Sequence, residues 1–151
     1  MKKIKRALIS VSDKKLLKDL LKVLTKYKIE LISSGGTYNE IRKLKFKCLE
    51  VSEYTGFSEI LGGRVKTLHP KIHAGILSKR NKKSHIKDLE KNNFSEIDLV
   101  IVNFYPFEKT LEQTNNHLKI IENIDVGGPT MVRAAAKNYN DVTVITSSGQ
   151  Y

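Results

Sequence analysis

The apolar residues of the chain follow two alternating patterns, which predict alternating strands and helices. Short, nearly continuous apolar runs predict buried strands, and they lie at residues 4–11, 29–33, 47–51, 97–104 and 141–146. Segments with apolar residues three or four positions apart predict amphipathic helices, at residues 14–27, from the 34–37 turn to about 44, and at 81–92, 106–113, 117–123 and 130–139. The first helix is the clearest, and we expect Ser12 or Asp13 to cap its N-terminus.

This alternation predicts the fold class. Strands that alternate with helices usually form a parallel sheet, because each crossover helix packs back onto a face of the sheet. We therefore predict a three-layer α/β fold, with a mostly parallel sheet and helices on both faces. The run at residues 97–104 is the most apolar of the strands, which is typical of the middle of such a sheet. The 151 residues fit one domain and contain no internal repeat.

One long segment follows neither pattern. Residues 53–61 predict no more than a helical turn, and residues 62–75 show neither the strand period nor the helix period. Irregular segments of this length inside a compact domain usually serve a function. This segment is therefore a candidate for part of a site.

The composition narrows the class of protein. Hydrophobic residues make up 40% of the chain, which is enough for a buried core. No apolar run approaches the ~20 residues of a membrane-spanning helix, and the apolar stretch near the N-terminus is too short for a secretory signal. The one cysteine, Cys48, falls in a predicted strand and excludes an internal disulfide. We expect a soluble, cytoplasmic protein.

The net charge of +11 raises the possibility of a nucleic-acid partner. However, 22 of the 27 basic residues are lysines, whereas base and phosphate recognition favours arginine. The lysines are also spread along the chain on faces expected to be solvated. We therefore expect no nucleic acid, although the positive field would steer a small phosphate-bearing substrate.

Candidate anion contacts follow the predicted strands, where ligands bind in open α/β sheets. The segment 33–37 (SSGGT) places small hydroxyls and glycines before a helix, which suits a phosphate cradle but equally an ordinary tight turn. Lys14 can supply counter-charge from the neighbouring helix. Arg64, Lys66 and Thr67 in the irregular segment suit further anion contacts, or form a solvated basic loop.

Two other groups of residues have side chains typical of functional sites. His69 and His73 lack a third ligand nearby, so we expect no metal site. Gly127 and Gly128 precede a helix that carries Lys137 near its end, which by itself is an ordinary Gly-Pro helix start.

Five segments occur in one order along the chain: SVSDK (10–14), SSGGT (33–37), GGRVKTLHPKIHAGIL (62–77), NFYPF (103–107) and IDVGGPTMVRAAAKN (124–138). Together they resemble the inosine monophosphate (IMP) cyclohydrolase domain of the bifunctional purine-biosynthesis enzyme, over essentially all of residues 1–151. Phe104 and Val126 are small departures that keep apolar character. The resemblance implies a methylglyoxal-synthase-like fold, the last ring closure of purine synthesis, and a homodimer.

The resemblance also implies what the chain does not contain. The family's other half is an aminoimidazole carboxamide ribonucleotide (AICAR) formyltransferase, which we expect downstream of this chain. Its cofactor, 10-formyltetrahydrofolate, belongs to that half, and the cyclohydrolase step needs no cofactor. The partners implied are the substrate formyl-AICAR and the product IMP, with no membrane and no nucleic acid.

The resemblance assigns site residues motif by motif. The nucleotide and phosphate contacts are Ser12, Asp13, Lys14, Ser34, Gly35, Gly36, Thr37, Arg64, Val65, Lys66 and Thr67. The base and carboxamide contacts are Val102, Asn103, Asp125 and Val126. The catalytic group is Lys137, as proton donor and acceptor, with Lys66, Tyr105 and Asp125.

The chemistry suggests roles for this group. We expect Lys137 to cycle protons near Lys66, Tyr105 and Lys66 to stabilise the formyl oxygen, and Asp125 to orient the carboxamide. Replacing Lys137 by Leu should keep nucleotide binding and lower turnover by orders of magnitude. One tension is that a straight helix from Pro129 to Lys137 spans about 12 Å, which separates Lys137 from Asp125.

Two alternatives share the expected fold. A methylglyoxal synthase would use the same phosphate cradle with carboxylate chemistry, and would leave Lys66, Tyr105 and Lys137 unexplained. A non-catalytic regulatory domain that senses nucleotides would need only the cradle.

Overall fold

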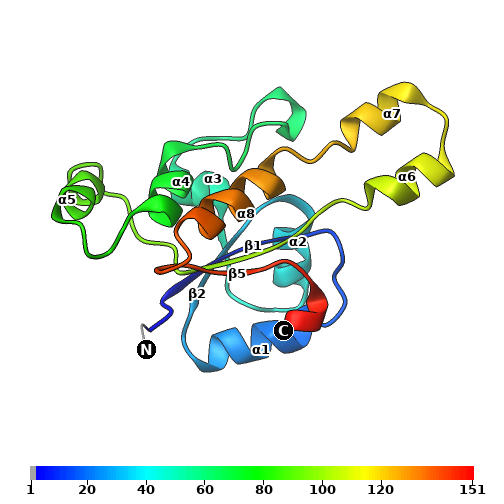
Figure 1. The fold of residues 1–151 in the computed structure, drawn as a ribbon. Helices are drawn as coiled ribbons and strands as arrows, with labels where there is room; N and C mark the ends of the chain where they lie inside the picture. The colour runs from blue at the N-terminus through cyan, green and yellow to red at the C-terminus, as the bar shows by residue number, and fades with distance from the viewer. Residues whose placement is uncertain (1–2) are drawn as a thin grey trace.

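The computed structural model describes residues 3–151, and its core is a five-stranded sheet in which every strand pair is parallel (Figure 1). The strand order is β3-β2-β1-β4-β5. The strands are β1 (Arg6–Val11), β2 (Glu30–Ser33), β3 (Leu49–Glu50), β4 (Leu99–Asn103) and β5 (Thr143–Ile145). This sheet confirms the predicted α/β class, and the apolar run at residues 97–104 supplies an inner strand, β4.

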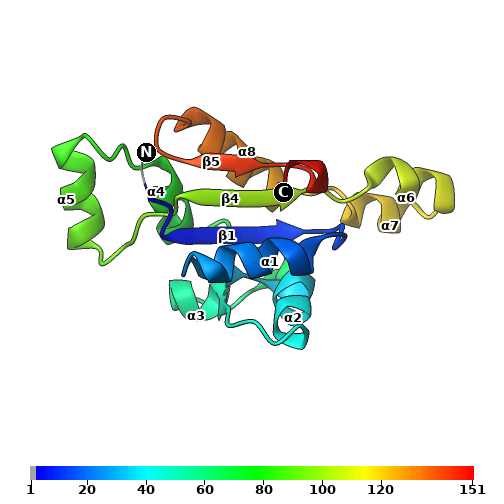
Figure 2. The ribbon, with the colours of Figure 1, turned by 90° about the horizontal axis from the view of Figure 1, so that it is seen from below.

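Helices cover both faces of the sheet (Figure 2). They are α1 (Leu17–Lys26), α2 (Gly35–Lys43), α3 (Val51–Thr55), α4 (Pro70–Leu77), α5 (Lys83–Lys91), α6 (Phe107–Gln113), α7 (His117–Glu122) and α8 (Gly127–Lys137), with short 3₁₀ turns η1 (Leu61–Gly63) and η2 (Ser148–Gln150). Each face has its own apolar core, because successive strand side chains point to opposite faces. Ile9 of β1 packs with Leu21 of α1, whereas Leu8 packs with Met131 of α8.

The structure corrects two predictions about local secondary structure. Residues 70–77 form α4 inside the segment expected to be irregular, with Pro70 in its first turn and the His69 ring accepting a hydrogen bond from the Lys71 N–H at 3.1 Å. Val51 begins α3, so the strand expected to reach it ends at Glu50. The apolar runs predicted these elements only partly, because an eight-residue helix buried on one side has too few turns to show a period.

The cap predicted for the first helix is also wrong. Leu16, at a left-handed φ of 59°, precedes α1, and no side chain caps this helix. The Asp13 carboxylate instead accepts a hydrogen bond from the Lys15 N–H at 2.9 Å, two residues along. Asp13 therefore closes its own short turn, which delays the start of α1.

Arg80 links three elements at the amino end of the sheet. Its side chain is 10% exposed, and Nη2 donates to the carbonyl oxygens of Ile97, at 2.9 Å, and Gly75, at 3.2 Å. Its Nε lies 3.3 Å from a carboxylate oxygen of Glu96. The Asp98 carboxylate, 3.8 Å from Arg80 Nη2, also accepts the Arg6 N–H that opens β1. This one guanidinium therefore joins α4 to the segment that enters β4.

Gly75 allows α4 to approach that segment closely. A Cβ atom at residue 75 would lie 2.6 Å from the Ser95 carbonyl oxygen and 3.2 Å from the Ile97 side chain. We therefore expect Gly75→Ala to lower the free energy of unfolding by about 2 kcal/mol, because backbone on both sides must shift. Urea unfolding measures this change. Gly36→Ala is the control, since a Cβ there meets no atom within 4 Å, and an equal loss in both variants would contradict the packing argument.

Helices α6 and α7 form an arm that projects past the carboxyl ends of the strands, whereas α5 lies at the opposite end (Figure 2). We call residues 105–124 the arm. Neither α6 nor α7 contains a buried residue. The arm therefore depends little on the sheet's core for its packing.

Cys48 lies immediately before β3 instead of inside a strand. Its thiol is free and buried, and burial raises its pKa to about 12. It behaves as a small apolar core residue.

Candidate functional site

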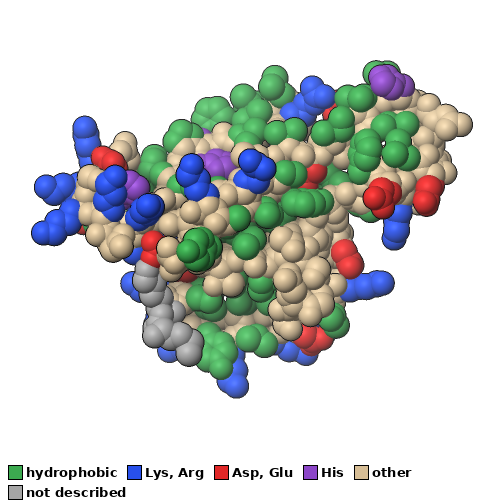
Figure 3. Space-filling model, in the orientation of Figure 1, with side chains coloured by type: hydrophobic (Ala, Val, Ile, Leu, Met, Phe, Trp, Pro, Cys, Tyr) green, Lys and Arg blue, Asp and Glu red, His purple; other side chains and the backbone are tan. Residues whose placement is uncertain are grey.

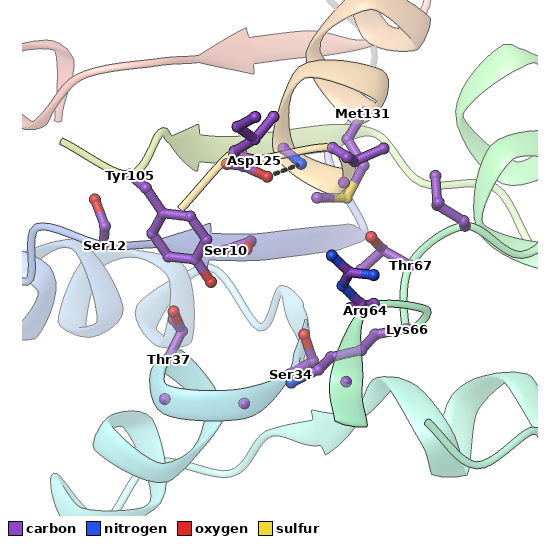
Figure 4. A pocket seen from close by; sticks show the side chains of 18 of the residues that line it. Ser10, Ser12, Ser34, Thr37, Arg64, Lys66, Thr67, Tyr105, Asp125 and Met131 are labelled. Carbon is purple, nitrogen blue, oxygen red and sulfur yellow. Dashed lines mark hydrogen bonds between the residues drawn. The ribbon is translucent and has the colours of Figure 1, made fainter. Parts of the chain in front are cut away.

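A cavity of about 840 Å³ opens at the carboxyl ends of the strands, beside the arm (Figure 4). Its walls come from the ends of β1 and β4, the first turns of α2 and α8, the η1 loop and the arm. This is the edge at which parallel α/β sheets bind ligands. The segments that follow separate strands in the sequence therefore meet at one place.

The Asn103 side chain joins the ends of β1 and β4. Its Oδ1 accepts hydrogen bonds from the N–H groups of Ser12, at 2.6 Å, and Asp13, at 2.9 Å, and its Nδ2 donates to the Asp13 carbonyl oxygen. The Ser12 hydroxyl donates to the Phe104 carbonyl oxygen at 2.6 Å. The amide of Asn103 thus holds the turn after β1, and its side chain is occupied by this bracing.

Thr37 fixes α2 to the end of β1. Its buried hydroxyl accepts from the Val11 N–H at 3.0 Å and donates to the Val11 carbonyl oxygen at 2.9 Å. Ser34 precedes the helix without capping it, and Gly35 begins the helix at a left-handed φ of 54°. The first N–H groups of α2 have no intrahelical acceptor and face the cavity with the positive end of the helix dipole. This arrangement is suited to an anion.

The η1 loop carries cations to the other side of the cavity. A backbone bridge pairs Ile60 with Val65, and the loop between them turns through left-handed residues, including Gly62 and Gly63. Lys66 follows the bridge, and its Nζ pairs with the Glu59 carboxylate at 2.9 Å. The tight turn therefore fixes where the Lys66 ammonium lies.

Arg64, at the end of the η1 loop, reaches the arm. Its Nη2 lies 2.7 Å from one carboxylate oxygen of Glu122, and its Nε donates to the other at 3.3 Å. Both side chains are more than half exposed, so this ion pair is weak. Its planar guanidinium remains suited to a phosphate or carboxylate of a ligand.

The first turn of α8 closes the cavity. The Asp125 carboxylate accepts a hydrogen bond from the Gly128 N–H at 2.9 Å, drawn as the dashed line in Figure 4. A Cβ on Gly128 would collide with this carboxylate, and a Cβ on Gly127 would lie 2.7 Å from the Thr67 hydroxyl. Both glycines therefore allow Asp125 and the η1 loop to pack against the helix.

The structure brings together most of the residues that the resemblance assigned. Those that line the cavity are Ser12, Lys14, Ser34, Gly35, Gly36, Thr37, Arg64, Lys66, Thr67, Asn103, Tyr105, Asp125 and Val126. Those that do not are Asp13, Val65, Val102 and Lys137. The Val102 side chain is buried in the core, and Asp13 is exposed beside the cavity. These two residues, with Val65, do not direct their side chains at a ligand.

Contrary to the expectation that it acts near Lys66, Lys137 does not line the cavity that Lys66 lines. Lys137 is exposed at the last residue of α8, ten residues after the helix begins at the cavity, which is a rise of about 15 Å. The next residue, Asn138, is buried and donates hydrogen bonds to the carbonyl oxygens of Ile76, at 2.8 Å, and Ser78, at 2.9 Å. These bonds hold the end of α8 on α4, away from the cavity.

Several lining residues carried no signal in the sequence. Ile121 and Glu122 come from α7, and Leu61, Leu68 and Met131 are apolar residues that a sequence reader assigns to a core. His73, a candidate metal ligand from the sequence, does not line the cavity. Desolvation lowers its pKa, and it contacts the backbone of Thr67.

Residues 3–151 contain no cluster of three or more side chains typical of a metal site, and no helix among them is long and apolar enough to span a membrane.

Comparisons with known proteins agree with this architecture. The family model of the MGS-like domain matches residues 16–130. The chain is 56% identical over 147 residues to the bifunctional purine biosynthesis protein PurH of Prochlorococcus marinus (strain NATL1A). It is 50% identical over 149 residues to PurH of Acetivibrio thermocellus. These matches cover 96% and 98% of this chain, but only 28% and 29% of the relatives.

A solved structure shares the fold. The crystal structure of ForH superposes with a TM-score of 0.85 at 30% sequence identity, and the match covers 98% of this chain and 76% of that one. The strand order of the sheet, the cavity at its carboxyl edge and the match to the family model all indicate the same family. The chain belongs to the family of MGS-like domains, and it corresponds to a region of the bifunctional purine biosynthesis protein PurH.

Proposed function

We propose that this domain is an IMP cyclohydrolase, which closes the pyrimidine ring of formyl-AICAR to give IMP and water. The observation that carries the proposal is the cavity in which the ammonium of Lys66, the phenol of Tyr105 and the carboxylate of Asp125 surround one space beside the anion cradle of α2. The similarity of the chain to PurH supports the same activity. The nucleotide phosphate and the reacting carbonyl both require cations or N–H donors, and this cavity supplies them.

The reaction proceeds in two steps. The carboxamide nitrogen adds to the formyl carbon and loses one of its two protons, while the formyl oxygen takes up charge and then a proton to become a hydroxyl. The formamido nitrogen then gives up its proton to form the C=N bond, the hydroxyl takes up a proton, the C–O bond breaks, and water leaves. Lys66 and Tyr105 stabilise the formyl oxygen, and Asp125 orients the carboxamide nitrogen through its N–H groups. None of these steps transfers electrons to a cofactor.

Residues outside the reacting group hold the nucleotide. We propose that Lys14, Arg64 and the first turn of α2 bind the phosphate. The amide of Asn103 braces the turn that carries Ser12, and the backbone of Asn103, which lines the cavity, faces the base. The substrate formyl-AICAR, the product IMP and the absence of a required cofactor stay predictions of the proposal.

Within one chain, Lys137 is exposed and lies about 9 Å of helical rise beyond Met131, the last residue of α8 that lines the cavity, so its role requires a second copy of the chain. A homodimer is supported by apolar side chains left exposed beside the cavity. Leu61, Leu118 and Val126 are 69%, 76% and 57% exposed. Figure 3 shows apolar side chains along this side, whereas basic side chains gather over α5. We propose that the partner's Lys137 supplies the proton transfer.

Lys137→Leu tests this role. We expect turnover to fall by about 10²–10⁴ while IMP binding, measured by calorimetry, is unchanged. Mixing Lys137→Leu with Lys66→Met chains should restore part of the activity, because a mixed dimer contains one complete site. Lys119→Leu, in α7, is the control. Full turnover in Lys137→Leu would remove Lys137 from the mechanism, and lost turnover without recovery on mixing would contradict the contribution across the dimer.

The decisive experiment follows purine absorbance in the ultraviolet when formyl-AICAR is added to the chain. Formation of IMP supports the cyclohydrolase. Tight IMP binding without turnover would instead indicate a nucleotide-sensing regulatory domain. Conversion of a triose phosphate to methylglyoxal would indicate the third candidate, a methylglyoxal synthase.

A further inference from the structure

Glu59 does not line the cavity, but its carboxylate pairs with the ammonium of Lys66, which does. Lys66 Nζ and Glu59 Oε2 are 2.9 Å apart. The two residues flank the backbone bridge between Ile60 and Val65, and residues that flank an antiparallel bridge lie opposite each other. The backbone of the η1 loop therefore brings this pair together.

The Lys66 ammonium lies between two glycines. A Cβ on Gly35 would be 3.3 Å from Nζ, and a Cβ on Gly63 would be 2.7 Å from Cε and 2.9 Å from Nζ. Gly35 is the first residue of α2, so the ammonium lies beside the positive end of that helix. In Figure 4 the Lys66 side chain extends toward Ser34, which precedes the same helix.

This position is unfavourable for a cation alone. The dipole of α2 repels positive charge at its first turn. A lysine side chain is long and flexible, and without a partner it would turn its ammonium toward water. Lys66 is nevertheless only 30% exposed, whereas Glu59 is 55% exposed. The carboxylate offsets the repulsion while remaining hydrated itself.

We propose that Glu59 is a positioning residue that holds the Lys66 ammonium beside the first turn of α2, from where the ammonium reaches the formyl oxygen of the ligand. The proposal rests on the proposed function for the identity of the reaction. Glu59 touches no reacting atom and lies outside the residues assigned by the resemblance. It acts on the rate by keeping Lys66 at one place.

Glu59→Gln keeps the shape of the side chain and removes its charge. We expect kcat for formyl-AICAR to fall by about 10–100-fold because Lys66 is misplaced. KM should stay the same or decrease, since the variant also removes a negative charge near an anionic substrate. The melting temperature should change by less than about 4 °C, because a partly exposed ion pair contributes little to stability.

The matched control is Glu30→Gln. Glu30 is also ion-paired, with its Oε2 2.5 Å from Arg6 Nε, but it lies at the amino end of the sheet. This control should keep wild-type kcat. Unchanged kcat in Glu59→Gln would overturn the proposal, and so would a loss of kcat explained by partial unfolding at the assay temperature. Glu59→Asp, which keeps the charge, should recover part of kcat.

A second measurement does not depend on turnover. NMR relaxation of the Lys66 Cε methylene, assigned by its loss in Lys66→Met, reports how far the side chain is ordered. We expect an ordered side chain in the wild type and in Glu30→Gln, and a mobile one in Glu59→Gln. Equal order in all three would overturn the proposal. A wild-type chain that forms no IMP would instead overturn the proposed function and leave this test intact.

Discussion

Lys66→Met should lower kcat/KM for formyl-AICAR by about 10²–10³ without unfolding the protein. The reason is that the substitution removes the one ammonium placed between Gly35 and Gly63, beside the positive end of α2. Loss of a single preorganised donor to a developing oxyanion typically has an effect of this size. Steady-state kinetics, followed by the absorbance of the purine product, measure it.

The control for this variant is Lys22→Met. Lys22 is also ion-paired, with its Nζ 2.8 Å from the Asp19 carboxylate, but it lies on α1, away from the cavity. It should keep wild-type activity and stability. Glu59, left without its partner, remains half-exposed and hydrated, so Lys66→Met should unfold near the wild-type temperature. Activity within about threefold of the wild type would contradict the assigned role.

Arg80→Met should produce the largest loss of stability, about 3 kcal/mol in the free energy of unfolding. Arg80 is almost buried, and it satisfies the carbonyl oxygens of Ile97 and Gly75 while pairing with Glu96. Removing Arg80 leaves the Ile97 carbonyl oxygen without this donor and the Glu96 and Asp98 carboxylates without their cation, whereas the Gly75 carbonyl oxygen still accepts from the Ile97 N–H at 3.0 Å. Urea unfolding followed by circular dichroism measures the change.

Arg42→Met provides the comparison for Arg80. Arg42 is exposed on α2, and its loss should change the free energy of unfolding by less than about 0.5 kcal/mol. A similar, small effect in both variants would show that the carbonyl oxygens around Arg80 are satisfied in another way.

The order of the elements was predictable because strong apolar patterns decide it. The apolar run of β4 fits only a buried strand, and the leucine stripe of α1 fits only a helix, so the pattern alone predicts both elements. Boundaries were less predictable. The start of α1 depends on the left-handed Leu16, and the start of α4 on the His69 ring, and both are set by contacts within a single turn.

The sequence motifs indicated which residues gather at the candidate site, but not how their side chains are arranged there. The glycines of the 34–37 turn indicated an anion cradle, and Gly35 indeed adopts a left-handed φ there. The pairing of Arg64 with Glu122 could not be foreseen, because it depends on how the arm folds back over the η1 loop. The displacement of Lys137 follows from Asn138, whose buried amide holds the end of α8. Helical rise indicated this separation, but only tertiary contacts decided it.

The arm has a consequence for how the protein responds to its surroundings. Segments without buried side chains open at low free-energy cost, and α6 and α7 have none. One wall of the cavity is therefore less stable than its floor, which is anchored in the sheet. Moderate warming or a low denaturant concentration would loosen this wall long before the strands separate, and the protein would lose its binding site while the sheet stays folded.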